Sequence, residues 1–276
     1  MSPSSSRSRT RVSARGRAVL VLLVAAAVFT AAYVLGVQND AGQRAENALL
    51  RASNLTSDVP PPLDWVSLQS IAVIAVLIAI IALFRSGVGG VVHALAAIAV
   101  AVVSAKALKN VFLERPEFHL ENPGNSFPSG HAAVVSVLIM TLLIVLPSTG
   151  RWIVMLLGAP LLITISAQLL AYGWHRPSDV FGGFALALGT LALGAVIRPA
   201  RGPVPPATPG LRRMRALLMG LGTLAFVVAL VVGMAGLGAG VNERILLAGQ
   251  IAGGGAAVWA LALASLLRIP ARTRTA

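Results

Sequence analysis

The sequence predicts an all-helical integral membrane protein, and three features support this prediction. Of its 276 residues, 57% are hydrophobic and only 11% are charged, and the mean hydropathy is +0.83, far above the balance of ordinary soluble domains. A membrane helix needs roughly 20 apolar residues, and the chain contains eight such stretches. Little sequence remains for a soluble domain between them. Cysteine is absent, which excludes disulfides, thiolate metal sites and cysteine nucleophiles.

Each apolar stretch is expected to form one transmembrane helix. The stretches are 18–37, 66–84, 88–112, 131–147, 152–173, 179–197, 216–238 and 245–267. The first has the basic start of a signal peptide, but its apolar run is longer than that of a typical cleaved signal, and we interpret it as a helix. Residues 38–65 are expected to form an outer loop that ends in three prolines, Pro60 to Pro62, a stiff segment.

Composition divides the chain into five parts. They are a basic, disordered tail at 1–16, six helices at 17–198, a Pro- and Arg-rich linker at 199–215, a two-helix extension at 216–267 and a basic tail at 268–276. The extension carries formal charge only at Glu243 and Arg244, in its turn. Its glycines are expected to let the two helices pack closely. They are Gly236, Gly238, Gly240, Gly253, Gly254 and Gly255.

The charges predict the orientation of the helices. If the N-terminus is cytoplasmic and eight helices follow, fifteen arginines lie on the cytoplasmic side: Arg7, Arg9, Arg11, Arg15, Arg17, Arg85, Arg151, Arg198, Arg201, Arg212, Arg213, Arg215, Arg268, Arg272 and Arg274. All nine acidic residues then lie outside or at outer helix ends: Asp40, Glu46, Asp58, Asp64, Glu114, Glu117, Glu121, Asp179 and Glu243. This asymmetry is typical of membrane proteins whose two termini are cytoplasmic.

The formal net charge of +13 therefore reflects topology. Attraction to anionic membrane lipids is a secondary consequence. We do not expect nucleic acid as a partner, and nothing in the sequence indicates an obligatory protein partner.

Ionisable groups at membrane depth are costly and often functional, and here they converge on the outer face. One cluster contains Lys106, Lys109 and Arg115, at the outer end of the third predicted helix. The second is the segment FPSGHAA at 127–133, and the third is GWHRPSD at 173–179. With the predicted topology, all three clusters lie at one face of the membrane.

The FPSGHAA segment is expected to form an anion site at a helix start. Ser129 is a plausible N-cap, and Gly130 allows a ligand to approach the backbone closely. Free amides at a helix N-terminus bind anions, but the dipole contributes only about 0.3 to 2 kcal/mol, so a phosphate needs cations too. Lys109, Arg115 and Arg176 are the candidates, and a guanidinium can donate two charge-assisted bonds to phosphate.

Two histidines complete a set for phosphoryl transfer. His131 and His175 each supply an imidazole, the side chain whose ordinary pKa lies nearest physiological pH. Asp179 follows His175 by four residues, a spacing that brings the carboxylate near one ring nitrogen on a helical turn. Such a partner orients the ring and leaves the other nitrogen free to attack or to transfer a proton.

These residues resemble a known family, the type 2 phosphatidic acid phosphatases, also called lipid phosphate phosphatases. The family carries Lys, six residues, Arg-Pro; then Pro-Ser-Gly-His; then Ser-Arg, five residues, His, three residues, Asp. This chain has KNVFLERP at 109–116, FPSGH at 127–131 and HRPSD at 175–179, in that order. The resemblance extends over the first six predicted helices.

The resemblance implies a six-helix phosphatase core and a phosphohistidine mechanism that uses no metal or other cofactor. His175 is then the nucleophile, Asp179 its orienting partner and His131 the acid for the leaving oxygen. Lys109, Arg115, Ser129 and the Gly130 amide bind the phosphate.

The chain departs from the family pattern in two places. Five residues separate Lys109 from Arg115, and the usual spacing of six would place Leu108 in the lysine position. Lys109 can serve only if the helix unwinds before Arg115, which the following proline favours. Leu169 stands where the family has its second arginine, after Gln168 in place of serine. Arg176 is the candidate that replaces the missing arginine.

Three rival interpretations remain at this stage. His131, His175 and Asp179 offer ligands to zinc, but there is no fourth ligand and the neighbouring cations favour an anion. A transporter would line a midplane path with polar groups, whereas here they gather at one end. A degenerate member of the family that binds a lipid head group without hydrolysis is compatible with the missing arginine. Two further histidines, His93 and His119, are expected to be packed and solvated, respectively.

The sequence thus predicts a bacterial phosphatase of the cell membrane with its active site at the extracytoplasmic face. Its substrate is expected to be an amphiphilic lipid phosphate. Polyprenyl phosphates or diphosphates, phosphatidic acid and phosphatidylglycerol phosphate all fit.

Overall fold

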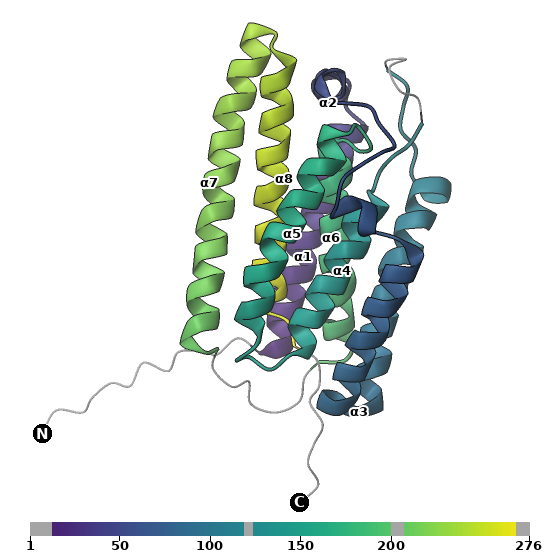
Figure 1. The fold of residues 1–276 in the computed structure, drawn as a ribbon, viewed down its shortest axis with the longest axis vertical. Helices are drawn as coiled ribbons and strands as arrows, with labels where there is room; N and C mark the ends of the chain where they lie inside the picture. Colours follow the sequence, from purple (N-terminus) through teal and green to yellow (C-terminus); the bar gives the residue numbers. More distant parts are fainter. Residues whose placement is uncertain (1–12, 119–123, 200–206, 269–276) are drawn as a thin grey trace, which may run out of the picture.

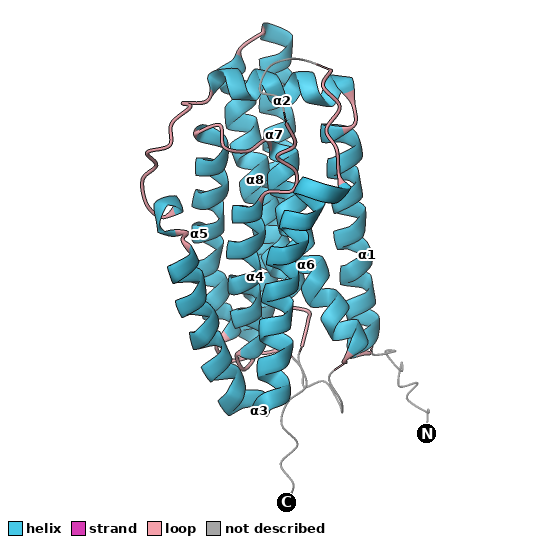
Figure 2. Cartoon of the chain, turned by 90° about the vertical axis from the view of Figure 1, so that its right-hand side faces the viewer, coloured by secondary structure: helices cyan, strands magenta, loops and turns pink. Residues whose placement is uncertain are grey.

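The computed structural model describes residues 13–118, 124–199 and 207–268, and all regular structure in these ranges is helical. The elements are α1 (Ala14–Ala32), its π-helical continuation η1 (Tyr33–Val37), α2 (Asp40–Ala52), the short 3₁₀ helix η2 (Leu63–Trp65), α3 (Leu68–Ala107), its π-helical continuation η3 (Leu108–Phe112), α4 (Gly130–Val145), α5 (Arg151–Ala171), α6 (Pro177–Ile197), α7 (Pro209–Ala239) and α8 (Asn242–Ala264). The long helices form a bundle, with α2 across one end (Figures 1 and 2). Six of the described helices are long and apolar enough to cross a membrane, and the predicted all-α membrane fold is confirmed.

Two of the eight predicted helices lie within α3. The backbone is helical on both sides of Gly87, which has φ 66° and ψ −167°, a conformation that glycine adopts without steric cost. A Cβ built on Gly90 would lie 2.3 Å from Ser86 Cβ, so the chain turns back tightly. Figure 1 shows the two arms of α3 as a hairpin at the lower end of the bundle. The predicted helices 66–84 and 88–112 are these two arms.

The connection at 38–65, predicted to be a loop, contains α2, so this prediction is wrong. The Asn39 side chain caps the helix by accepting from Gly42 N, and Arg44 pairs with Asp40 on the exposed face. The opposite face is buried and includes Glu46 and Leu49. Helical spacing of its buried residues was readable in the sequence, but its low mean hydropathy hid it from a search for membrane helices.

The C-terminal hairpin is part of the bundle. Helix α8 packs against α5, α6 and α2 as well as α7, and a Cβ on Gly249 would lie 2.4 Å from the Leu49 side chain of α2. The expectation of glycine packing holds for Gly236 and Gly255, which lie against neighbouring helices, but Gly238 meets open space. Gly240 instead ends α7 in the left-handed conformation.

Helix α7 begins at Pro209, earlier than the predicted 216. Thr208 caps it by accepting from Leu211 N, and proline suits the first helical position. The first turns of α7 therefore contain three of the four arginines of the predicted linker, Arg212, Arg213 and Arg215.

Many of the described arginines gather at the end of the bundle opposite α2, whereas the described acidic side chains lie at the α2 end together with the basic residues of the predicted clusters. Arg151 lies near Arg85, Arg215 and Arg268, at the end where α1 and α7 begin (Figure 1). The described acidic residues lie in α2, in the connections that follow α2 and η3, and at the starts of α6 and α8. Eight predicted positions fall outside the described residues: Arg7, Arg9, Arg11, Arg201, Arg272, Arg274, Glu121 and His119.

Candidate active site

The three predicted clusters meet beneath α2. Lys109 lies in η3 and Arg115 in the irregular segment that follows it. The start of α4 carries His131, the turn before α6 carries His175, and the first turn of α6 carries Asp179. The ring centroids of His131 and His175 are 6.2 Å apart. The FPSGH segment is held by Phe127, which is fully buried. Its ring packs on Phe29 of α1, with the centroids 5.0 Å apart.

Asp179 is the centre of the hydrogen-bond network. Its carboxylate is fully buried and accepts from Arg115 Nη2 at 2.8 Å, from Ser126 Oγ at 2.6 Å and from the Arg176 backbone N–H at 2.9 Å. Its backbone carbonyl accepts from the Ser129 N–H at 2.8 Å. One aspartate therefore links the segments that carry all three motifs.

His175 lies directly beside this carboxylate. Its Nδ1 is 3.5 Å from Asp179 Oδ2, an ion-pair distance slightly longer than a good hydrogen bond. Nδ1 forms no hydrogen bond within the described residues, so Asp179 is the partner available to it. The other nitrogen, Nε2, is then left for chemistry, as expected for an imidazole whose tautomer is set by a carboxylate.

His131 lies in the first turn of α4, next to the indole ring of Trp174. Its ring centroid is 5.5 Å from that of Trp174. The Trp174 indole donates to the Thr56 carbonyl at 2.7 Å, which fixes the ring in place. The two histidines therefore face each other across a short gap, with Trp174 on one side.

The start of α4 has the open space that an anion needs. The Ser129 side chain accepts from Ala132 N at 3.2 Å and caps the helix, as predicted. A Cβ built on Gly130 meets nothing within 4 Å, whereas at Gly183 it would lie 2.7 Å from the Ser129 carbonyl oxygen. The amides of a first helical turn lack intrahelical partners. Gly130 is therefore open where Gly183 is tightly packed.

Two buried guanidinium groups belong to the network around Asp179. The Arg115 side chain is 4% exposed, and its Nε and Nη1 form no hydrogen bond with any described residue. Arg176 Nη1 donates to Ser126 Oγ at 3.2 Å. Arg176 also lines a polar cavity of about 190 Å³ together with His175 and Ser126. The Arg176 side chain thus points into the site.

The helix that carries Lys109 unwinds before Arg115, as the unusual spacing of these two residues requires. The regular helix gives way to the π turn η3, and Leu113 is extended, with φ −118° and ψ 135°. The Asn125 side chain donates to the carbonyls of Lys109 and Leu113 and so stabilises this helix end. The helix therefore ends before Arg115, and the Lys109 ammonium is close enough to Asp179 to interact with it electrostatically.

Leu169 and Gln168 serve the fold at the positions where the family has Arg and Ser. Leu169 is fully buried in the hydrophobic core, and its carbonyl accepts from the His175 N–H. The Gln168 side chain accepts from Leu63 N and donates to the carbonyls of Pro60 and Pro61. Neither side chain joins the network around Asp179.

The structure adds residues that the sequence did not single out. Ser126 bridges Asp179 and Arg176, and Asn125 closes the end of η3. Both lie just before FPSGH in the sequence, and this proximity to a motif is the only sequence feature that could have indicated a role in the site. Glu46 of α2 lies 3.6 Å from Arg115, in a segment predicted to be a loop.

In the described part of the chain, neither His93 nor the acidic residues indicate a second site. His93 lies at the opposite end, next to Gly194 and Arg198, consistent with a packing role. Across the ranges that the structure describes, no group of three or more His, Cys, Asp or Glu side chains is placed to hold a metal ion.

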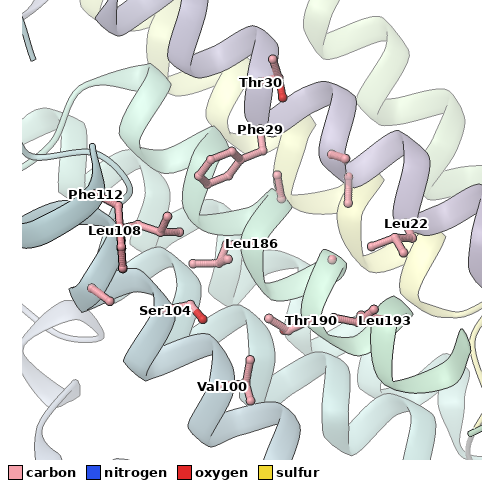
Figure 3. Close-up of a pocket in the computed structure, with 15 residues that line it drawn as sticks. Leu22, Phe29, Thr30, Val100, Ser104, Leu108, Phe112, Leu186, Thr190 and Leu193 are labelled. Carbon is pink, nitrogen blue, oxygen red and sulfur yellow. The ribbon is translucent and has the colours of Figure 1, made fainter. Parts of the chain in front are cut away.

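An apolar groove approaches the site along the bundle surface. It lies between α1, the second arm of α3 and α6, has a volume of about 450 Å³, and is shown in Figure 3. Leu108 and Phe112, which flank Lys109 in the sequence, line its upper end, and Leu22 and Leu193 line the other. The groove thus runs from the middle of the helices to the turn that carries Lys109.

Comparison with known proteins agrees with the motifs. Residues 90–203 match the model of the PAP2 superfamily and include all three motif segments. One similar solved structure is the crystal structure of the first transmembrane PAP2 type phosphatidylglycerolphosphate phosphatase from Bacillus subtilis. It shares 21% identity, covers 68% of this chain and 99% of that chain, and gives a TM-score of 0.47. No curated protein matches the chain.

Proposed function

The chain belongs to the PAP2 superfamily, the type 2 phosphatidic acid phosphatases, and we propose that it hydrolyses the phosphate of an amphiphilic lipid beneath α2. The observation that carries this proposal is the pair of histidines, His131 and His175, 6.2 Å apart, with a buried carboxylate behind His175. Polyprenyl phosphates or diphosphates, phosphatidic acid and phosphatidylglycerol phosphate are the candidate substrates.

The phosphate binds among the cations and the amides at the start of α4. The Arg115 guanidinium has two nitrogens without a hydrogen-bond partner among the described residues, Arg176 lines the polar cavity, and Gly130 leaves room at the backbone. Lys109 adds charge from the end of η3. In a buried site, such charge-assisted bonds are each worth about 1.5–3 kcal/mol.

His175 and His131 then divide the chemistry. The Nε2 lone pair of His175 forms a bond to phosphorus while the bond from phosphorus to the lipid oxygen breaks, and the leaving oxygen takes a proton from His131. In the second step water attacks phosphorus, the bond to His175 breaks, and His131 accepts the proton of the water. Asp179 stabilises the charge that develops on His175. The sum for a phosphate monoester is lipid phosphate plus water giving lipid alcohol plus phosphate, and for a diphosphate it is lipid diphosphate plus water giving lipid monophosphate plus phosphate.

The lipid part of the substrate occupies the apolar groove of Figure 3. A hydrocarbon chain lying against Leu108 and Phe112 has its head group at the turn that carries Lys109. Burial of each CH₂ contributes about 0.8 kcal/mol, so the groove favours lipids over soluble phosphate esters.

The gathering of basic residues at the end opposite α2 supports the proposed orientation. Lys and Arg are retained on the cytoplasmic side of membranes, so both termini are cytoplasmic and the active site faces the other side. A channel or transporter is disfavoured because the polar groups of the three motif clusters gather at one end of the bundle, under α2, and do not line a path through the middle of the helices.

Phosphate release from a panel of lipid phosphates by the purified protein tests the proposal. Wild type, with chelator present, is expected to release phosphate, and His175→Ala is expected to be inactive. His93→Gln is the matched control, because it changes a buried histidine at the far end of the bundle. A ³²P-labelled head group should give an acid-labile phosphoprotein that His175→Ala cannot form.

Three outcomes would count against specific parts of this proposal. Full activity in His175→Ala would exclude it as the nucleophile. Loss of wild-type activity in chelator would indicate a metal-dependent reaction. If the protein binds lipid phosphates but releases phosphate from none of them, it recognises the head group without hydrolysing it. This second candidate function is supported by Leu169, which stands where the family has an arginine.

A further inference from the structure

Glu46 is a buried carboxylate that the phosphatase mechanism does not use. It lies in α2, its side chain is 9% exposed, and it contacts two other parts of the site. Its Oε1 accepts from the Ser178 N–H at 2.8 Å, and its Oε2 accepts from Ser178 Oγ at 3.1 Å. Its Oε2 is also 3.6 Å from Arg115 Nη1.

We propose that Glu46 is a positioning residue that joins α2 to the first turn of α6 and holds the Arg115 guanidinium in place for the phosphate. This inference rests on the proposed phosphatase function. Arg115 is attracted to Glu46 through Nη1 and to Asp179 through Nη2. Two carboxylates on different helices thus fix the plane of one guanidinium, which leaves Nε, the nitrogen that pairs with neither carboxylate, to meet the substrate in a defined direction.

The backbone on both sides of Arg115 is held by side chains of η1, of α2 and of the link between them. Tyr33 Oη and Gln38 Nε2 donate to the Glu114 carbonyl at 2.9 and 2.6 Å, and Gln43 Nε2 donates to the Pro116 carbonyl at 2.7 Å. The segment 114–116 has no regular secondary structure of its own. Its position therefore depends on η1 and α2, and Glu46 extends the same support to the Arg115 side chain.

Helix α2 approaches α6 closely because glycines, Gly36 and Gly42, stand where η1 leads into α2. A Cβ on Gly36 would lie 2.4 Å from Ser178 Cβ, and a Cβ on Gly42 would lie 1.8 Å from the Leu35 carbonyl oxygen. Larger side chains at either position would push Glu46 away from Ser178. Local packing thus serves the placement of one carboxylate.

The surroundings of Glu46 make its charge sensitive to pH. It lines a cavity of about 650 Å³ between α1, α2, α6, α7 and α8, and it alone among the described lining residues carries an ionisable group. Burial raises the pKa of the Glu46 carboxyl to about 7, and repulsion by Asp179 adds to the rise, while Arg115 opposes it. Arg176 is the other charged group near enough to interact with Glu46. Attraction of Arg115 therefore strengthens as Glu46 ionises around neutral pH.

Glu46→Gln separates the charge from the hydrogen bonds. The amide oxygen still accepts from Ser178 N and the amide nitrogen still donates to Ser178 Oγ, so the fold is retained, but the attraction of Arg115 is lost. We expect kcat/KM for lipid phosphate at pH 8 to fall on the order of tenfold, within the range of coupling energies between contacting residues. The melting temperature in detergent should stay equal to that of wild type or rise, since a desolvated carboxylate has been removed.

The pH profile supplies a readout that a purely structural role would not change. The ratio of kcat/KM for wild type to that for Glu46→Gln cancels the pH dependence that the two proteins share, including that of the substrate. We expect this ratio to be close to one below pH 6 and to rise through about pH 7, following ionisation of Glu46. Asp40→Asn is the control, because it removes an exposed carboxylate from the same helix and should give a ratio near one at every pH.

A double-mutant cycle with Arg115→Lys tests whether Glu46 acts through Arg115. The Glu46→Gln change should cost much less in the Arg115→Lys background than in wild type, and additive losses would overturn the proposal. Phosphate release by wild type with unchanged kcat/KM in Glu46→Gln would also overturn it and leave the phosphatase function intact. If Glu46→Gln does not fold, Glu46→Asp, which keeps an ionisable carboxylate on a shorter side chain, takes its place. Its ratio should stay nearly constant with pH, because both carboxylates ionise, and a ratio that rises through pH 7 as expected for Glu46→Gln would overturn the proposal. Failure of wild type to release phosphate would overturn both proposals.

Discussion

The side chains of Arg115 and Asp179 form a buried ion pair, with Nη2 2.8 Å from Oδ1, although 64 residues separate them in the sequence. The pair joins the first motif to the third. Because Asp179 also lies beside His175, the group proposed to bind phosphate and the group proposed to attack it share one carboxylate. Binding and chemistry are therefore coupled through Asp179.

Asp179→Asn should impair both catalysis and stability. An asparagine cannot stabilise the positive charge that develops on His175, and we expect kcat to fall by roughly 10²- to 10⁴-fold, the range for positioned acid–base groups. The change also leaves Arg115 without its closest counter-ion, and breaking a buried pair costs about 3–5 kcal/mol. Phosphate release and detergent unfolding measure the two effects.

The exposed carboxylate of Asp58 provides the comparison for this experiment. Asp58→Asn should change neither quantity, because Asp58 lies on the surface of the connection after α2. Wild-type kcat in Asp179→Asn would show that His175 needs no carboxylate partner.

Gly130→Ala should weaken substrate binding and leave the fold stable. An added Cβ meets no protein atom within 4 Å, but it occupies the space from which a phosphate reaches the amides at the start of α4. We expect KM to rise roughly tenfold, equivalent to losing one charge-assisted hydrogen bond. Titration of activity against lipid phosphate, with the melting temperature recorded in parallel, measures this.

Gly183→Ala should show the opposite behaviour. Its Cβ would lie 2.7 Å from the Ser129 carbonyl oxygen and 2.8 Å from Ala132 Cβ, and overpacking of this kind costs about 1–3 kcal/mol. An unchanged KM in Gly130→Ala would mean that the phosphate does not approach the helix start.

Arg176→Gln tests whether Arg176 takes the place of the arginine that the family has at Leu169. If it does, kcat/KM should fall roughly 10- to 100-fold, as expected for one lost charge-assisted bond of about 1.5–3 kcal/mol. Arg44→Gln, on the exposed face of α2, is the control for the loss of a guanidinium. Full activity in Arg176→Gln would mean that Lys109 and Arg115 supply the cationic contacts alone.

Much of this arrangement could be predicted from the sequence because the signals are strong. The apolar stretches exceed what soluble helices require, and the break at Gly87 fell between two of them. The convergence of His131, His175 and Asp179 followed from alternating helix direction, which places every second helix end at the same face. Even the end of the helix before Arg115 followed from the proline that comes after it.

The parts that were missed depend on tertiary contacts. Helix α2 is too polar to be found by hydropathy, and its role appears only when Glu46 and Gln43 meet segments far away in the sequence. Ser126 has no motif of its own, and its importance comes from lying between Asp179 and Arg176. The integration of α8 into the bundle likewise depends on glycines that contact α2 and α5, which composition alone does not specify.

The absence of native cysteine makes the orientation directly testable. Arg44→Cys places a thiol on the exposed face of α2, and Arg212→Cys places one in the first turn of α7, at the opposite end of the bundle. In intact cells, a membrane-impermeant maleimide should label Arg44→Cys and should label Arg212→Cys only after permeabilisation. The reverse pattern would place the active site on the cytoplasmic side.

Gly189→Leu should distinguish a lipid substrate from a soluble one. Gly189 lines the groove of Figure 3, and its Cβ would make only ordinary contact with Ala25, at 3.6 Å, so a leucine there projects into the groove without disturbing the helix. Displacement of about two CH₂ groups of the substrate costs roughly 1.6 kcal/mol, or about tenfold in affinity. We expect KM to rise by this factor for long-chain lipid phosphates and to remain unchanged for a short-chain, water-soluble phosphate ester. Gly220→Leu, at a position on α7 with open space around it, is the matched control and should affect neither substrate. Equal effects of Gly189→Leu on both substrates would mean that the hydrocarbon chain lies elsewhere, because only a chain that occupies the groove can feel the added side chain.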